Sequence, residues 1–296
     1  MPGRFLLLMA SAAVLLAASS APADDPDDAV KALEKLGAEV NRAWRLPGRP
    51  AIDVDLNGTK AVDEDLALVQ RMTILQGLHL NDTAVTDAGL VRLAGLAHLV
   101  ILDLDGTKIT SAGLVHLQGL NRVELLSLAR TKIAGKGLRY LPRMGKLGWL
   151  YLQDTGLKDV DLETIGQIVN LERLDLAGTK LTDAGLGHLR GLAKLDELGL
   201  SRTAVTGTGL ADLVGLSRLR YLDLRGSGIR DDRLDPLVGF TALQHLHLDN
   251  TNITDAGLAK LRGLSKLTFL GLSGTKVTKE GVADLRKSLP KCEIDY

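Results

Sequence analysis

A strict 24-residue spacing runs through most of this chain and limits the folds that it can adopt. A hydroxyl residue recurs at Thr59, Thr83, Thr107, Thr131, Thr155, Thr179, Thr203, Ser227, Thr251 and Thr275, with no insertion between them. A leucine precedes each of these positions by three residues, and a leucine or valine precedes it by five. Repeats of this length are typical of solenoid proteins, in which each unit packs only against its neighbours.

The hydrophobic period changes inside each repeat, as the sixth repeat shows. Around Leu174 the leucines alternate with other residues, which predicts a short strand with one buried face. From Leu186 they follow at every third residue, which predicts one or two turns of helix with Thr182 as the N-cap and Asp183 in the first turn. No unit can bury its leucines alone. We therefore expect the units to stack into an α/β solenoid with a parallel sheet along one side.

The column of hydroxyl residues has a structural explanation. A small hydroxyl side chain directly after each strand can pack inside the repeat while its oxygen satisfies a backbone group of the loop. We interpret the column as a ladder that stabilises the stack, and we assign it no chemistry. Ser227 keeps the hydroxyl and is expected to belong to the same ladder.

Written as LxxLxLxxTxLTDAGLxxLxxLxx, the repeat resembles that of the leucine-rich repeat family. The TDAGL segments at Thr86–Leu90, Thr182–Leu186 and Thr254–Leu258 make it similar to F-box-type leucine-rich proteins, with Thr in place of the usual Cys or Asn. The chain also resembles secreted repeat proteins of planctomycete-like bacteria. The resemblance covers residues 51–296 and implies a right-handed arc of about ten repeats, with the sheet on the concave side and short helices on the convex side.

The glycine of TDAGL is missing from three repeats. Asp65, Asp161 and Arg233 take its place, so we expect a slightly different chain path in the first, fifth and eighth turns. Pro142 and Pro236 fall in convex segments and should shorten the helices there.

The first 23 residues have the pattern of a secretory signal peptide. Arg4 precedes an apolar run from Phe5 to Ala18, and Ala21-Pro22-Ala23 provides a small-residue cleavage site. The run is shorter than the ~20 residues of a membrane-spanning helix. We predict cleavage near Ala23 and a secreted or periplasmic mature chain, with an uncleaved anchor as the alternative. No later stretch approaches spanning length, so no membrane insertion is expected after cleavage.

Residues 24–50 are predicted to form an N-terminal cap and linker before a repeat domain at 51–296. Apolar residues recur at helical spacing within 26–44, which predicts a capping helix over this range. Such a helix would cover the first repeat, as the ends of a solenoid require. At the other end Ile294 and Tyr296 continue the phase of the strands and predict a C-terminal cap.

Charge and cysteine content exclude several classes of protein. The chain has 36 Lys and Arg against 36 Asp and Glu, and this formal net charge of zero argues against a nucleic-acid binder. Its single cysteine, Cys292, excludes an intramolecular disulfide and a zinc site built from two or more thiolates. Cys292 is either a half-buried apolar residue or the origin of an intermolecular disulfide. We expect a monomer without a cofactor.

The candidate binding residues lie between the buried leucines of the strands, where side chains point outward from the concave face. They are the aromatic residues Trp149, Tyr151, Tyr221 and Phe269, the basic residues Arg225, His245 and His247, and the acidic residues Asp53, Asp55, Asp103 and Asp105. Exposed aromatic residues are enriched at interface hot spots, although cross-strand packing for stability gives the same pattern. The acidic residues are suited to a cation or a basic peptide, or they form a solvated patch that keeps the open sheet from pairing.

Two arrangements on this face have residue types that occur at sites of chemistry. His79, Asp103 and Ser127 share one column, but a catalytic triad needs histidine between the acid and the serine, and here Asp103 is in the middle. The two histidines of the ninth repeat, with the aspartates near them, give only a weak metal signal, and we assign no metal. No phosphate-binding loop, metalloprotease motif or nucleophile elbow is present.

The sequence therefore predicts a non-catalytic module that binds a protein or peptide on its concave face. Two alternatives stay open. One is a carbohydrate or cell-envelope binder in which Trp149 and Tyr151 stack on sugar rings. The other is a structural spacer of the envelope with no specific ligand.

Overall fold

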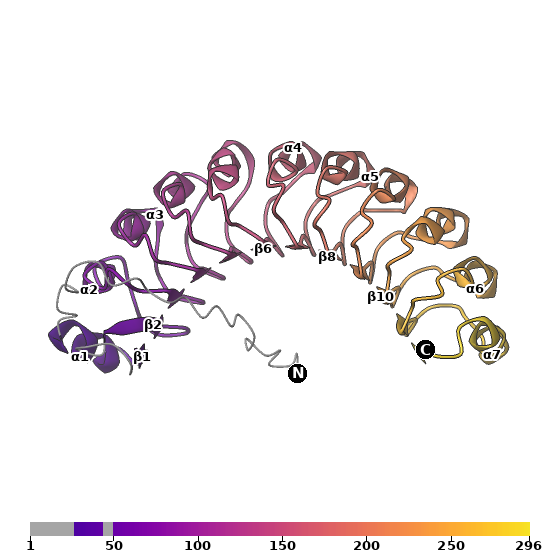
Figure 1. Cartoon of the computed structure of the whole chain (residues 1–296), viewed down its shortest axis with the longest axis horizontal. Helices are drawn as coiled ribbons and strands as arrows, with labels where there is room; N and C mark the ends of the chain where they lie inside the picture. The colour runs from indigo at the N-terminus through magenta and orange to yellow at the C-terminus, as the bar shows by residue number, and fades with distance from the viewer. Residues whose placement is uncertain (1–26, 44–49) are drawn as a thin grey trace.

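The chain forms one arc of stacked repeats in a computed structural model that describes residues 27–43 and 50–296 (Figure 1). The strands line the inner, concave side of the arc and the helices line the outer, convex side. Within the described residues, twelve strands form a single sheet in the order of the chain. The predicted α/β solenoid is thereby confirmed. The predicted signal segment, residues 1–23, lies outside the described residues.

The strands are short and repeat at the spacing expected from the sequence. They are β1 (Glu39–Arg42), β2 (Ala51–Asp55), β3 (Gly77–His79), β4 (Ile101–Asp103), β5 (Leu125–Ser127), β6 (Trp149–Tyr151), β7 (Arg173–Asp175), β8 (Glu197–Gly199), β9 (Tyr221–Asp223), β10 (His245–His247), β11 (Phe269–Gly271) and β12 (Glu293–Asp295). From β2 to β12 all pairs are parallel, and Leu174 lies opposite both Leu150 and Leu198. Because each step is 24 residues with no slip, equivalent side chains form straight columns across the sheet.

The convex segments are helices of one to three turns. The α-helices are α1 (Asp27–Lys35), α2 (Leu66–Val69), α3 (Asp87–Leu90), α4 (Leu162–Ile165), α5 (Asp183–Leu186), α6 (Asp255–Leu261) and α7 (Lys279–Ser288). The 3₁₀ helices are η1 (Val91–Leu93), η2 (Gly113–Leu117), η3 (Gly135–Arg143), η4 (Asp159–Asp161), η5 (Gly187–Leu189), η6 (Thr208–Leu213), η7 (Asp231–Arg233) and η8 (Asp235–Gly239). Thr182 caps α5 as predicted, because its side chain accepts a hydrogen bond from the N–H of Ala184.

The predicted threonine ladder is present in nine of the ten repeats. Each threonine donates a hydrogen bond from Oγ1 to the carbonyl of the leucine three residues earlier, as Thr179 does to Leu176 at 2.6 Å. Ser227 is the exception, because its buried hydroxyl has no hydrogen-bond partner. Serine lacks the β-methyl group that restricts the χ1 angle of threonine, so nothing holds its oxygen toward Leu224.

Replacing the exceptional serine should repair the ladder. We expect Ser227→Thr to raise the free energy of unfolding by about 1 kcal/mol, because it satisfies a buried hydroxyl and adds a buried methyl group. Urea denaturation of the parent and variant chains measures this gain. A variant less stable than the parent would show that the pocket around Ser227 is too small for the methyl group.

A second contact joins neighbouring repeats on the flank where the helices begin. The aspartate of one TDAGL segment accepts hydrogen bonds from both the N–H and the hydroxyl of the threonine in the next. Asp87 accepts them from Thr110 at 2.7 and 2.6 Å. The same bridge joins Asp63 to Thr86, Asp159 to Thr182, Asp183 to Thr206, Asp231 to Thr254, and Asp255 to Thr278.

The glycine of TDAGL leaves room for this carboxylate. A Cβ atom at Gly113 would collide with Oδ1 of Asp87, and a Cβ at Gly281 would collide with the carboxylate of Asp255. Aspartate in one repeat thus requires glycine in the next. The two residues of the motif are two halves of one contact between repeats.

This contact explains the three repeats that lack the glycine. Asp161 follows a repeat with Gly135 at the aspartate position, and Arg233 follows one with Gly207 there. Gly135 and Gly207 have no carboxylate to place against the next repeat, so a side chain is tolerated at residues 161 and 233. Asp65 belongs to the first repeat, which has no earlier TDAGL segment. Asp161 uses the space itself, since its Oδ1 accepts a hydrogen bond from the N–H of Gly135 at 2.9 Å.

The substitution Gly281→Ala tests this fit because Gly281 lies inside α7. Alanine favours a helix over glycine by about 0.5–1 kcal/mol, but here its Cβ meets the carboxylate of Asp255. We expect Gly281→Ala to destabilise the parent chain by about 1–2 kcal/mol. In an Asp255→Gly background the same change should instead stabilise the chain. Urea denaturation of the four chains measures the coupling, and an effect of the same sign in both backgrounds would contradict the fit.

The N-terminal cap differs from the single helix expected over 26–44. Helix α1 ends at Lys35, and the chain returns as β1, which pairs antiparallel with β2. Gly37 is the cause: it adopts a left-handed φ of 97°, and the N–H of Ala38 closes the helix end onto the carbonyl of Leu33 at 3.0 Å. The prediction of helix is therefore wrong from Leu36 to the end of β1.

At the C-terminal end the sheet continues for one strand beyond the last complete repeat. Ile294 in β12 is buried as predicted, whereas Tyr296 lies beyond the strand and is 45% exposed. Cys292 is a buried free thiol, and burial raises its pKa to about 11. Within the described ranges, no helix combines the length and apolar character needed to span a bilayer.

Candidate functional site

The register of the sheet places all eleven predicted binding residues on the concave face but does not bring them to one place. They fall into three groups, separated along the arc. The acidic end comprises Asp53, Asp55, Asp103 and Asp105, around β2 and β4. Trp149 and Tyr151 lie on β6, and the aromatic platform comprises Tyr221, His245, His247 and Phe269, on β9 to β11. Arg225 lies beside the platform, directly after β9.

His79 lies at the centre of the acidic end, and the sequence analysis did not include it among the binding residues. Its Nε2 is 3.4 Å from Oδ2 of Asp53, and its Nδ1 is 3.9 Å from Oδ2 of Asp103. Burial alone would lower the pKa of His79, but hydrogen bonds and charges from Asp103 and Asp53 outweigh it and raise the pKa to about 10. The imidazole is therefore protonated at neutral pH and balances part of the acidic charge.

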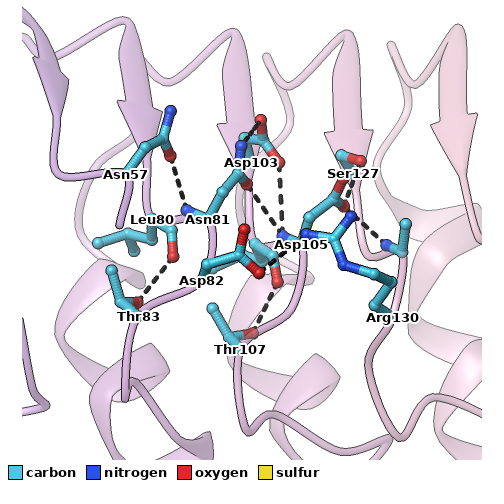
Figure 2. A network of polar contacts seen from close by, with 12 residues as sticks. Asn57, Leu80, Asn81, Asp82, Thr83, Asp103, Asp105, Thr107, Ser127 and Arg130 are labelled. Carbon is cyan, nitrogen blue, oxygen red and sulfur yellow. Dashed lines mark hydrogen bonds and ion pairs between the residues drawn. The ribbon is translucent and has the colours of Figure 1, made fainter. Parts of the chain in front are cut away.

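A ladder of side chains crosses the acidic end from strand to strand (Figure 2). Oδ1 of Asn57 accepts a hydrogen bond from the N–H of Asn81, and Oδ1 of Asn81 accepts one from the N–H of Asp105. Asp105 continues it by accepting from the N–H of Ala129 at 2.7 Å and from the hydroxyl of Ser127. Burial raises the pKa of Asp105 to about 6. These bonds fix the carboxylate of Asp105 in one orientation.

An ion pair borders the acidic end and recurs farther along the arc. Asp82 and Arg130 both adopt left-handed backbone conformations and pair at 2.9 Å (Figure 2). Gly106 is the equivalent residue of the repeat between them, in the turn after β4. Seventy-two residues later, Asp154 and Arg202 pair in the same way at 3.3 Å. A side chain at Gly106 would collide with Asp82. Each pair therefore ties the first and third of three consecutive repeats.

A basic side chain that was not among the predicted binding residues, Arg173, lies beside Trp149 and Tyr151. The guanidinium of Arg173 lies over the ring of Trp149, 4.2 Å from its centroid, and pairs with Glu197 at 3.1 Å. Burial raises the pKa of the Tyr151 phenol. The signal was available, because Arg173 occupies the outward position of the strand next to Trp149. One face of the indole is therefore already covered.

The aromatic platform is a continuous set of four rings. The His247 ring lies 5.0 Å from the ring of Tyr221 and 4.9 Å from that of Phe269, and the His245 ring lies 6.1 and 6.3 Å from the same two. All four side chains are half-buried, so they present faces and edges to solvent while packing on each other. Burial lowers the pKa of His247, which keeps this ring neutral at neutral pH.

Arg225 has an internal partner beside the platform. Its guanidinium binds Asp223 with two bonds, Nη2 to Oδ2 at 2.6 Å and Nε to Oδ1 at 2.9 Å. Asp223 is buried and Arg225 is exposed. The pair has no net charge, and of its two charged groups only the guanidinium of Arg225 is exposed to solvent.

The structure does not assemble the arrangements considered for chemistry. The hydroxyl of Ser127 donates to Asp105, whereas His79 lies between Asp53 and Asp103. Among residues 27–43 and 50–296, no group of three or more His, Cys, Asp or Glu side chains is placed to hold a metal ion.

Comparison with known proteins agrees with this architecture. Sequence profiles described as leucine-rich repeats match residues 95–117, 168–189 and 211–277. The stacked strand–helix units and the in-register sheet define a solenoid of this class. The chain belongs to the leucine-rich repeat family. No curated protein matches its sequence.

Two solved structures illustrate the likeness of fold. A leucine-rich repeat protein of Leptospira interrogans has a TM-score of 0.59 at 21% identity, and the match covers 78% of this chain and 62% of that one. The ectodomain of the receptor kinase GASSHO1/SCHENGEN3 from Arabidopsis thaliana, solved in complex with CASPARIAN STRIP INTEGRITY FACTOR 2, has a TM-score of 0.52 at 16% identity. That match covers 87% of this chain and 40% of the ectodomain. This chain thus spans less than two thirds of the length of either protein.

An NMR titration of His79 tests the electrostatics of the acidic end. We expect a midpoint near pH 10 in the parent chain and near the ordinary value of 6.5 in an Asp53→Asn/Asp103→Asn variant. A raised pKa in the folded state stabilises the fold below pH 6.5, and this contribution is lost as the pH rises toward 10. A parent midpoint near 6.5 would show that the two carboxylates do not hold the proton.

Proposed function

We propose that this chain is a non-catalytic module that acts outside the cytoplasm and binds a protein partner on its concave face. The aromatic platform is the observation that carries this proposal. The described core is built almost entirely from aliphatic side chains, with Phe240 inside it, so these four rings are not needed to fill it. Large half-buried rings on an unpartnered sheet face are typical of interface anchors.

The fold likeness supports the same proposal. The GASSHO1/SCHENGEN3 ectodomain is named in complex with another factor, so an arc of this architecture serves recognition in that protein. The predicted signal segment at 1–23 supports a location outside the cytoplasm. We propose that this chain likewise meets its partner there.

Within the concave face we assign the main contact to the platform. Trp149 is a weaker candidate for stacking on a sugar because Arg173 already covers one face of its ring. Arg225 beside the platform and the acidic end farther along the arc give the surface its polarity. The two alternative functions, a carbohydrate binder and a structural spacer without a ligand, are distinguished from this proposal by the crosslinking experiment below.

Site-specific photo-crosslinking tests the proposed surface. A benzophenone amino acid would replace Phe269 in the platform in one chain and Val160, which is 68% exposed in η4, in a control chain. We expect a discrete protein adduct from position 269 in an extracytoplasmic extract, and none from position 160. Mass spectrometry identifies the adduct, and melting curves confirm that both chains fold.

Each other result contradicts the proposal in a distinct way. Equal adducts from both positions would place recognition outside the concave face. Loss of the adduct on adding soluble glycans would favour a carbohydrate ligand. No adduct from either chain would favour a structural spacer.

A further inference from the structure

The formal net charge of zero conceals a separation of charge between the faces of the arc. The outward positions of the sheet carry the carboxylates Asp53, Asp55, Asp103, Asp105, Asp175, Glu197, Asp223, Asp249, Glu293 and Asp295. The basic residues at these positions are His79, Arg173, Arg225, His245 and His247, and no lysine occurs there. Lysines do directly follow the threonine ladder, as at Lys60, Lys108 and Lys180. They are exposed and lie outside the strands. The concave face is therefore strongly acidic.

His79 and the two arginines of this face are already engaged. His79 lies between Asp53 and Asp103, Arg173 pairs with Glu197, and Arg225 pairs with Asp223. In the part of the chain that the structure describes, these pairs leave Asp55 and Asp175 without a cationic partner. Asp249 has only His247, at 3.8 Å.

These three carboxylates are held in place. Each uses Oδ1 to accept a backbone N–H at the end of a strand: Asp55 from Asn57, Asp175 from Ala177, and Asp249 from Ser273. Their side chains therefore lose little conformational freedom when a cation binds. Burial raises the pKa of Asp175, although hydrogen bonds from Ala177 and Gln153 act in the opposite direction.

The face contains an internal example of how it accepts a cation. Arg173 lays its guanidinium over Trp149, 4.2 Å from the centroid, and reaches Glu197 on the next strand at 3.1 Å. The aromatic platform repeats these ingredients without an occupant of its own. Its rings lie beside Asp249, which follows β10, and the neutral His247 ring does not repel a cation. A planar guanidinium suits both stacking and pairing better than an ammonium does.

We infer that the partner of the concave face presents a basic, arginine-rich segment of its chain. The segment lies along the arc, with one arginine on the aromatic platform beside Asp249 and another near Asp55 at the acidic end. This inference rests on the proposed function and specifies the chemistry of the partner. From β2 to β10 there are eight strand spacings of about 4.8 Å, a span that about twelve extended residues cover.

A synthetic peptide of that length provides the probe. The dodecapeptide (Gly-Arg)₆, labelled with a fluorophore, is titrated with the full chain and compared with (Gly-Lys)₆ and (Gly-Glu)₆ by fluorescence anisotropy. We expect (Gly-Arg)₆ to bind at least about threefold more tightly than (Gly-Lys)₆, because only arginine stacks and pairs at once. Binding should weaken between about 50 and 200 mM salt, and (Gly-Glu)₆ should not bind.

A matched pair of double variants separates the face from the net charge. Asp55→Asn/Asp249→Asn removes two concave carboxylates and keeps an acceptor oxygen for each backbone N–H. Glu163→Gln/Glu280→Gln removes the same charge from exposed positions in α4 and α7. The concave variant should weaken (Gly-Arg)₆ binding about tenfold, and the control should change it less than about twofold. Equal weakening in both variants would overturn the inference.

The outcome is distinguishable from a failure of the proposed function. If position 269 yields a protein adduct while (Gly-Arg)₆ binds no better than (Gly-Lys)₆ or (Gly-Glu)₆, the arginine-rich partner is excluded and concave recognition stands. An adduct whose crosslinked peptide contains arginines, lost in the Asp55→Asn/Asp249→Asn chain, supports both. If position 269 yields no adduct, the proposed function itself is contradicted.

Discussion

Most neighbouring repeats in this chain are fastened together by a carboxylate that occupies the place of a missing side chain, as six Asp–Thr bridges show. Asp87 reaches Thr110 only because residue 113 is glycine, and the same geometry recurs along the flank. A contact that needs two residues at fixed offsets in successive repeats does not tolerate an insertion. Where it occurs, this contact supports the 24-residue spacing, the register of the sheet and the straight columns of the concave face.

The same principle shapes the concave surface. Carboxylates such as Asp53 and Asp175 lean over the glycine of the next strand, and others accept the N–H groups at strand ends. Their orientation is therefore set by the backbone before any ligand arrives. Because leucine fills the interior, the polar and aromatic residues of this face are not needed to form the core. The sheet thus supplies a rigid support on which charge and rings are distributed unequally along the arc.

The sequence allowed the stacking to be predicted in detail because periodicity depends only on spacing. The strands, the ladder through Thr179 and the cap at Thr182 follow from it. The end of α1 does not follow from the spacing, because the apolar positions continue at helical spacing past Gly37, whose left-handed backbone stops the helix. The positions of the site residues followed from the register, but their partners did not. That Arg173 covers Trp149 and that His79 holds a proton between two carboxylates depend on side-chain directions, which spacing alone does not determine.

The paired aspartate and arginine that bridge two repeats have a consequence for the length of the arc. Arg130 and Arg202 are each the last member of such a pair, and Gly135 and Gly207 follow them at the same offset. A chain without residues 147–218 would bring Gly135 next to Arg233, the neighbour that Gly207 has now. The glycine and the arginine beside it would thus keep their present contact across the new junction. On this flank the array repeats at an interval of three repeats, so a change of its length by three repeats disturbs this contact less than a change by one.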